Sequence, residues 1–117
     1  MGLDAGIVCQ DGTEVIYWRK ANAIHKWFVE NIQDGIDDCG EYEVTVEQLT
    51  ELRDLCYQVI ENRELAEELL PTQSGFFFGS TDYGEWYFEN LINTINCLDD
   101  LLAETDVGDM FVYWSSW

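Results

Sequence analysis

Apolar residues follow a two-residue period at the start of the chain. Residues 3–9 and 13–18 are short runs rich in Ile, Val and aromatic side chains, and Asp11-Gly12 lies between them. This dipeptide is typical of a tight hairpin turn, because a type I′ turn needs positive φ at both central positions. We therefore predict two antiparallel strands joined by a short turn.

The period then changes to three and four, which is typical of an amphipathic helix. It runs from about Arg19 to residues 34–35, and an acidic loop follows at 34–43. The next helix begins at Thr45, which can form a capping box with Gln48. Its predicted buried stripe comprises Leu49, Leu52, Cys56, Val59 and Ile60.

The second half of the chain continues the mixture of helices and strands. A short helix at 64–70 is stopped by Pro71. Residues 72–80 (TQSGFFFGS) are predicted to be a loop that enters a short aromatic strand, and a long helix follows at 83–104. The chain ends in an alternating strand at 110–114. The apolar side of the long helix comprises Phe88, Leu91, Ile92, Ile95, Leu98 and Leu102.

This order of elements predicts one α+β domain over residues 1–117. We expect a small, mostly antiparallel sheet, formed by the N-terminal hairpin and the C-terminal strands, with three or four helices packed on it. The composition agrees, because 47% of the residues are hydrophobic and 15% are aromatic, whereas disordered chains lack such residues.

Charge restricts the function. The chain has 24 acidic residues against five Lys and Arg, a net charge of -19. Nucleic acids and anionic membranes bind through Lys and Arg, so neither is expected as a direct partner. The longest apolar runs are too short to cross a bilayer, and the polar start MGLDAGIVCQDGTE is unlike a secretory signal. We therefore expect a cytoplasmic protein, in the host cell if a phage encodes it.

The four cysteines, Cys9, Cys39, Cys56 and Cys97, form no C-x-x-C pair. This argues against a zinc site or a redox motif. In the reducing cytoplasm we expect free thiols, with Cys56 and Cys97 filling core positions of helices. The acidic loop at 34–43 lacks the spacing of a calcium-binding EF-hand. We predict neither a cofactor nor a metal.

The few cations are concentrated. Arg19, Lys20, His25 and Lys26 fall within eight residues. If a helix began near Arg19, the side chains of Arg19, Asn22 and Lys26 would share one face of it, and His25 would lie beside Asn22. In a strongly acidic protein such a group of donors can form a selective anion pocket. The alternative is that these cations pair with the surrounding carboxylates.

Other polar and aromatic residues complete this candidate ligand site. Trp18 and Tyr83 would stack on a base, and Thr72 and Ser74 would donate hydroxyl hydrogen bonds to the ligand. Arg19, Lys20 and Lys26 would hold a phosphate, while Asn22 and His25 would bond a sugar or base edge. The segment around Thr72 does not match the P-loop pattern.

Carboxylates form a second candidate site. Glu47, Glu51, Asp54 and Glu61 lie along one side of the predicted helix, about one turn (about 5.4 Å) apart. Such a row can imitate the phosphates of DNA and occupy the basic groove of a nucleic-acid-binding protein. The alternative is an ordinary solvated helix face.

Residues 17–28 (YWRKANAIHKWF) and 70–81 (LPTQSGFFFGST) carry distinctive motifs. With these motifs, the MGLD start and the aromatic C-terminal strand, the chain resembles a family of small acidic proteins of phages and bacteria. The likeness covers most of the chain and implies a phage or prophage origin rather than a mechanism. Small phage proteins often counter host defence, some by sequestering nucleotide signals and others by mimicking DNA.

We therefore expect a counter-defence protein that binds a small anionic nucleotide without catalysis. The alternative is an acidic DNA mimic that inhibits a host nuclease or another DNA-binding defence protein. An enzyme would have to use His25, the only histidine, with Cys39 or Ser74 as nucleophile. No local sequence resembles a nucleophile elbow or a cysteine-protease signature. The sequence therefore favours a binding protein over an enzyme. The oligomeric state is left open.

Overall fold

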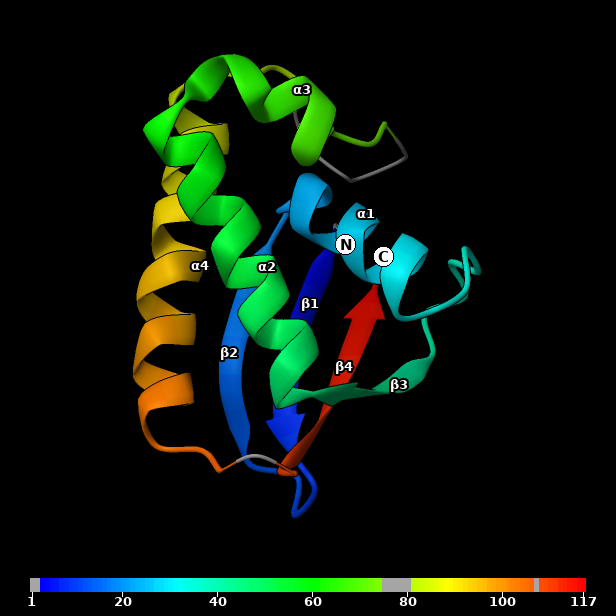
Figure 1. The fold of residues 1–117 in the computed structure, drawn as a ribbon. Coiled ribbons are helices and arrows are strands. Elements are labelled where there is room, and N and C mark those ends of the chain that lie inside the picture. The colour runs from blue at the N-terminus through cyan, green and yellow to red at the C-terminus, as the bar shows by residue number, and fades with distance from the viewer. Residues whose placement is uncertain (1–2, 75–80, 107) are drawn as a thin grey trace.

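A computed structural model of the protein describes residues 3–74, 81–106 and 108–117. Figure 1 shows the helices gathered on one side of a single sheet. All strand pairs are antiparallel. The α+β class predicted from the sequence is thus confirmed. Among the helices of the described residues, none combines the length and apolar character that crossing a bilayer requires.

Four strands form the sheet in the order β2-β1-β4-β3. The predicted hairpin is confirmed, and the Cys9 amide donates to the Thr13 carbonyl at 2.8 Å. The type I′ turn expected for Asp11-Gly12 was wrong, because Gly12 has a φ of 91° but Asp11 does not have a positive φ. The first and last strands lie side by side at the centre of the sheet (Figure 1). The strands are β1 (Asp4–Cys9), β2 (Glu14–Arg19), β3 (Glu41–Thr45) and β4 (Met110–Ser116).

Strand β3 was not predicted, because the sequence pattern places an acidic loop at 34–43. Glu41 and Glu43 make this segment resemble a loop, but they alternate with Tyr42 and Val44. Val44 is buried and lies opposite Phe111 on β4. A charged edge strand of this kind acquires its conformation from pairing with its neighbour.

The predicted helices are present, with shifted ends. The capping box of α2 is confirmed: the Gln48 amide donates to Thr45 Oγ1 at 3.1 Å, and the Thr45 amide donates to Gln48 Oε1 at 2.9 Å. The helices are α1 (Asn22–Asn31), α2 (Val46–Glu61), the 3-10 turn η1 (Arg63–Leu65), α3 (Ala66–Leu69) and α4 (Glu85–Ala103).

The prediction that the first helix begins near Arg19 was wrong. Arg19 is the last residue of β2, and Lys20 follows with a φ of 54°. The Lys20 amide donates to the Leu3 carbonyl at 2.6 Å, which keeps this residue beside the sheet. Arg19 therefore does not share a helical face with Asn22 and Lys26.

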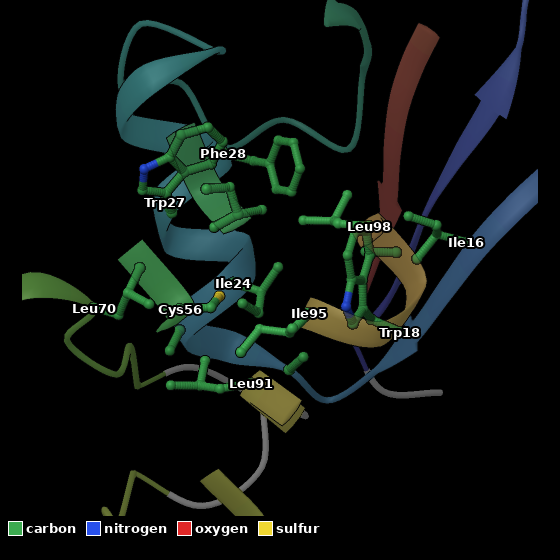
Figure 2. Packing of buried hydrophobic residues seen from close by; sticks show 14 of the residues in the cluster. Ile16, Trp18, Ile24, Trp27, Phe28, Cys56, Leu70, Leu91, Ile95 and Leu98 are labelled. Atoms are coloured by element: carbon green, nitrogen blue, oxygen red, sulfur yellow. The ribbon is translucent and has the colours of Figure 1, made fainter. Parts of the chain in front are cut away.

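The core lies between the helices and one face of the sheet. Figure 2 shows Ile16 and Trp18 directed from β2 toward Leu98 of α4. The ring of Phe28 on α1 stacks on Tyr113 of β4, with centroids 3.8 Å apart and planes 6° apart. These contacts join the first helix, the long helix and both halves of the sheet into one core.

Two predicted core positions on α4 were wrong. Cys97 and Ile92 are exposed, since each lies one residue away from a fully buried leucine and so points off the buried side of the helix. Cys56 on α2 is fully buried, as predicted. The aromatic strand expected within 72–80 falls mostly on residues 75–80, outside the described residues, and residues 72–74 have no regular structure.

Candidate functional site

The first predicted ligand residue, Arg19, points to a carboxylate on its own sheet. Its Nη1 lies 3.4 Å from Asp4 Oδ1, on the neighbouring strand β1. The Tyr17 hydroxyl donates to the same carboxylate. The Arg19 side chain is 56% exposed. This matches the alternative in which the cation pairs with a neighbouring acid.

Lys26 behaves in the same way. Its Nζ lies 3.7 Å from Glu30 Oε1, one helical turn further along α1. It borders an open hollow of about 180 Å³ that is also lined by Glu51 and Leu55 of α2 and by Pro71. Carboxylates on both sides of this hollow make it unfavourable for an anion. Lys26 and Arg19 do not converge on one site.

Trp18 belongs to the core rather than to a ligand site. Its side chain is buried, and its indole Nε1 donates to Thr94 Oγ1 on α4 at 2.8 Å. The Thr94 hydroxyl in turn donates to the Asn90 carbonyl at 2.7 Å. The hydrogen bond satisfies the indole donor, as expected for a buried tryptophan. Trp18 thus links β2 to α4.

His25 is also buried, with only 1% of its surface exposed. Its Nδ1 lies 2.6 Å from the Tyr113 hydroxyl, and its Nε2 lies 2.9 Å from Asp37 Oδ1. Burial lowers the pKa of His25, an effect that the hydrogen bond and negative charge of Asp37 oppose. The imidazole is therefore a buried polar link among α1, β4 and the loop before β3.

Four of the remaining predicted residues, Lys20, Asn22, Thr72 and Tyr83, lie in one region of the structure. Asn22 Oδ1, at the start of α1, accepts a hydrogen bond from the Gln73 amide at 3.0 Å. Thr72 donates from its amide to the Tyr83 hydroxyl at 3.1 Å. The two sequence motifs therefore meet in space, through Asn22 and the segment that contains Thr72. Ser74, the last residue before the gap, is exposed.

A small cleft lies at this junction, between the start of α1 and the first turns of α4. Its volume of about 10 Å³ leaves room for at most about one water molecule. Lys20 borders it and forms no ion pair with any carboxylate of the described residues. The polar and aromatic side chains of the cleft are those of Lys20, Asn22, Thr72, Asp82, Trp86, Tyr87 and Asn90.

The sequence analysis did not single out four polar or aromatic residues of this cleft: Asp82, Trp86, Tyr87 and Asn90. Trp86 is 51% exposed although it is a large aromatic residue in a helix. The sequence carries a signal that Trp86 is exposed, since this residue precedes the apolar stripe of α4, which begins near Phe88. Its proximity to Lys20 depends on how α4 packs against α1, which no local pattern encodes.

The predicted carboxylate row on α2 is exposed. Glu47, Glu51, Asp54 and Glu61 all lie in α2 and face solvent. Their spacing of four, three and seven residues keeps them on one side of the helix over about 21 Å. Among the described residues, Asp54 is the one member of the row that forms an ion pair, with Arg53 at 3.2 Å.

Arg53 also connects the row to α4. Its Nη1 lies 3.5 Å from Asp99 Oδ1, and the Tyr57 hydroxyl donates to Asp99 Oδ2 at 2.6 Å. Figure 1 shows α2 and α4 side by side along their length. Further exposed carboxylates lie on α4, at Glu85, Glu89 and Asp100.

The acids at the carboxyl ends of the helices oppose the helix dipole. Neither α2 nor α4 has a basic residue in its last turn, and Glu61 ends α2 while Asp100 and Glu104 lie at the end of α4. A negative charge at this position destabilises a helix, typically by about 0.3–1 kcal/mol. These carboxylates therefore do not stabilise the helices that carry them.

Within the parts of the chain that the structure describes, no group of three His, Cys, Asp or Glu side chains is arranged to hold a metal ion. Comparison with protein-family models, with curated proteins and with solved structures finds no match. The geometry of the chain itself is thus the basis for any functional proposal.

Proposed function

We propose that this protein is an acidic inhibitor that binds the basic groove of a nucleic-acid-binding partner, such as a host nuclease or DNA-binding defence protein. In a phage setting it would act in counter-defence. The observation that carries the proposal is the exposed carboxylate row of α2, three of whose four members form no ion pair among the described residues.

Two physical arguments support this proposal. Carboxylates at the ends of α2 and α4 cost helix stability, and this cost is explained if their charge serves a partner. A groove lined by Lys and Arg attracts a dense negative surface at long range, which speeds association and selects against acidic proteins. Solvated carboxylates contribute little energy within the isolated molecule.

Displacement of DNA tests the proposal directly. A labelled DNA duplex is bound to each member of a panel of host nucleases and DNA-binding defence proteins, and the protein is titrated in while fluorescence anisotropy is measured. We expect release of the duplex from at least one member. The apparent affinity should fall steeply as salt is raised above about 0.15 M, because the attraction is screened.

A matched pair of variants locates the effect. One variant combines Glu47→Gln, Glu51→Gln, Asp54→Asn and Glu61→Gln; the control neutralises four exposed acids elsewhere, Asp34, Glu64, Glu67 and Glu68. Both carry the same net charge. We expect displacement to weaken about tenfold or more in the first variant and much less in the control. Equal effects, or no displacement by the unmodified protein, would contradict the proposal.

Nucleotide binding at the cleft between α1 and α4 is the second candidate function. It is favoured by one observation: Lys20 has no ion-pair partner in the described residues and lies beside Asn22, Thr72 and Trp86. The small volume requires the cleft to widen before a base or a phosphate enters. Calorimetry against mono-, di- and cyclic nucleotides tests it, with Lys20→Ala expected to abolish binding and Lys26→Ala as the control.

A further inference from the structure

The helices cover only one face of the sheet, as Figure 1 shows. Every strand residue of the core cluster lies on that covered face, for example Ile7, Ile16 and Tyr113. The alternate residues lie on the opposite face, which we call the outer face. No helix of the described residues packs against it, and Tyr17 on this face is 48% exposed.

Two aromatic side chains form the centre of the outer face. Tyr17 on β2 and Trp114 on β4 lie on either side of Gly6 on β1, and their ring centroids are 6.4 Å apart. A Cβ atom on Gly6 would stand 2.7 Å from the Trp114 indole nitrogen. The absence of a side chain at Gly6 therefore lets the indole lie down against the sheet. Val8 and Val112, both partly buried, extend this apolar centre.

Carboxylates surround this aromatic pair. Glu41 lies opposite Trp114, and Glu43 lies opposite Val112, both on the exposed edge strand β3. Glu14 is exposed at the start of β2. At the other end of the β1–β2 pair, Asp4 accepts a hydrogen bond from the Tyr17 hydroxyl. Arg19 is the one cation among the described residues of this face, and it is paired with Asp4.

We propose that the outer face binds an arginine-bearing segment of a basic partner protein. A guanidinium group stacks on aromatic rings and at the same time donates a bidentate fork to a carboxylate, whereas a lysine ammonium is more strongly hydrated and does neither as well. The aromatic pair with acids on both sides offers both interactions. The inference rests on the proposed function only for the basic character of the partner.

Charge argues against the other occupants of this face. A second copy of the chain would bring its own carboxylates against Glu41 and Glu43, and like charges across an interface cost several kcal/mol. A nucleic acid or anionic membrane is repelled by the same acids. The sheet face measures roughly 20 Å by 20 Å, which suits one segment of a partner rather than a whole domain.

The outer face supplies aromatic contacts, which a row of carboxylates lacks. Binding energy in protein interfaces is concentrated in a few desolvated aromatic and arginine contacts, while exposed ion pairs contribute little. Helix α2, which carries the carboxylate row, lies on the helical side of the sheet, opposite the outer face (Figure 1). The two surfaces can therefore be tested separately.

Chemical-shift mapping tests the inference on the intact protein. The ¹⁵N-labelled chain is titrated with a short peptide of alternating Arg and Gly and, in parallel, with the matching Lys-Gly peptide. We expect the largest changes at the Trp114 indole N–H and at the amides of β1 and β4, with binding of the Arg peptide roughly three- to fivefold tighter than that of the Lys peptide.

Variants of Tyr17 complete the test. Tyr17→Ala should weaken binding of the Arg peptide roughly three- to fivefold, whereas Tyr17→Phe keeps the ring and should bind nearly normally. Trp86→Ala, which removes an exposed tryptophan of the helical side, is the matched control and should have no effect. Thermal unfolding of each variant verifies that it is folded.

The outcomes separate this inference from the proposed function. Shifts confined to α2 and α4, equal affinity for the Arg and Lys peptides, or no binding of the Arg peptide would each overturn the assignment of the outer face. In the first case DNA displacement that depends on the α2 row would still stand. Loss of DNA displacement with intact Arg-peptide mapping would instead overturn the proposed function alone.

Discussion

The Nδ1 atom of His25 on α1 lies 2.6 Å from the phenolic oxygen of Tyr113 on β4. The other ring nitrogen faces the Asp37 carboxylate, which can only accept a hydrogen bond, so Nε2 carries the proton. Burial raises the pKa of Tyr113 well above its usual value and keeps the phenol protonated. Tyr113 therefore donates to Nδ1 of a neutral imidazole.

Stability should decrease on acidification because of His25. Its pKa in the folded protein is lowered from the usual value of about 6.5, mainly by burial. Below about pH 6.5 the unfolded chain takes up a proton that the folded chain resists, so the free energy of unfolding falls as pH decreases. Above that pH the contribution of His25 is constant.

Thermal unfolding between pH 8 and pH 5 measures this effect. His25→Gln should lower the melting temperature at every pH but should lack the decrease that begins near pH 6.5. Carboxylate protonation relieves repulsion in both proteins and so cancels in the comparison. Parallel pH profiles for the two proteins would show that His25 does not govern the acid sensitivity.

Two substitutions at Tyr113 should separate its ring from its hydroxyl. Tyr113→Phe keeps the stacking on Phe28 but leaves His25 Nδ1 without this donor, and we expect a loss of about 1–3 kcal/mol. Tyr113→Ala removes both and should cost about 3–5 kcal/mol. Urea unfolding gives both values, and equal losses would mean that the ring contributes nothing beyond its hydroxyl.

Gly6→Ala should destabilise the sheet and displace Trp114. The new methyl group would stand 2.7 Å from both the Ile16 carbonyl oxygen and the Trp114 indole nitrogen, so backbone and side chain must both shift. We expect a cost of about 1–3 kcal/mol. A changed resonance of the Trp114 indole N–H would accompany it, whereas Gly84→Ala, where space is open, should leave that resonance unchanged.

The capping box of α2 should be worth about 1 kcal/mol. Thr45→Ala removes the oxygen that accepts from the Gln48 amide. Thr50→Ala, one turn further along α2, removes only a hydroxyl that donates to the Val46 carbonyl, and a bond of this kind stabilises a helix little. Chemical denaturation of both variants should show a clear loss for Thr45→Ala alone.

Neutralising acids at opposite ends of α4 should have opposite effects. Asp100→Asn removes a charge near the negative end of the helix dipole and should stabilise the protein by about 0.3–1 kcal/mol. Glu85→Gln removes a favourable charge from the first turn and should destabilise it by a similar amount. Both effects should shrink at high salt. Stabilisation by both variants would mean that overall repulsion, rather than the dipole, dominates.

Much of the fold could be predicted from the sequence because its signals are local. Asp11-Gly12 predicts the hairpin, and the Thr45–Gln48 spacing predicts the start of α2 within the chain segment itself. Strand β3 escaped prediction because Glu41 and Glu43 give it the composition of a loop. Its conformation depends on β4, more than sixty residues away in the sequence.

The candidate site could be predicted only in part. Clustering of Arg19, His25 and Lys26 in the sequence suggested convergence, yet Lys20 adopts a positive φ and ends the continuity between strand and helix. In the structure Arg19 points to Asp4, His25 points into the core and Lys26 points to Glu30. Proximity along the chain does not fix direction when a strand passes into a helix.

The sequence by itself determined the class of the fold, the capped start of α2 and the strong negative charge, because periodicity, turn residues and composition act over a few residues. The tertiary structure alone decided that Trp18 and His25 are buried and that Tyr17 and Trp114 share an uncovered face. Those properties arise from packing between distant segments, and the burial of a side chain depends on which neighbours the whole fold brings to it.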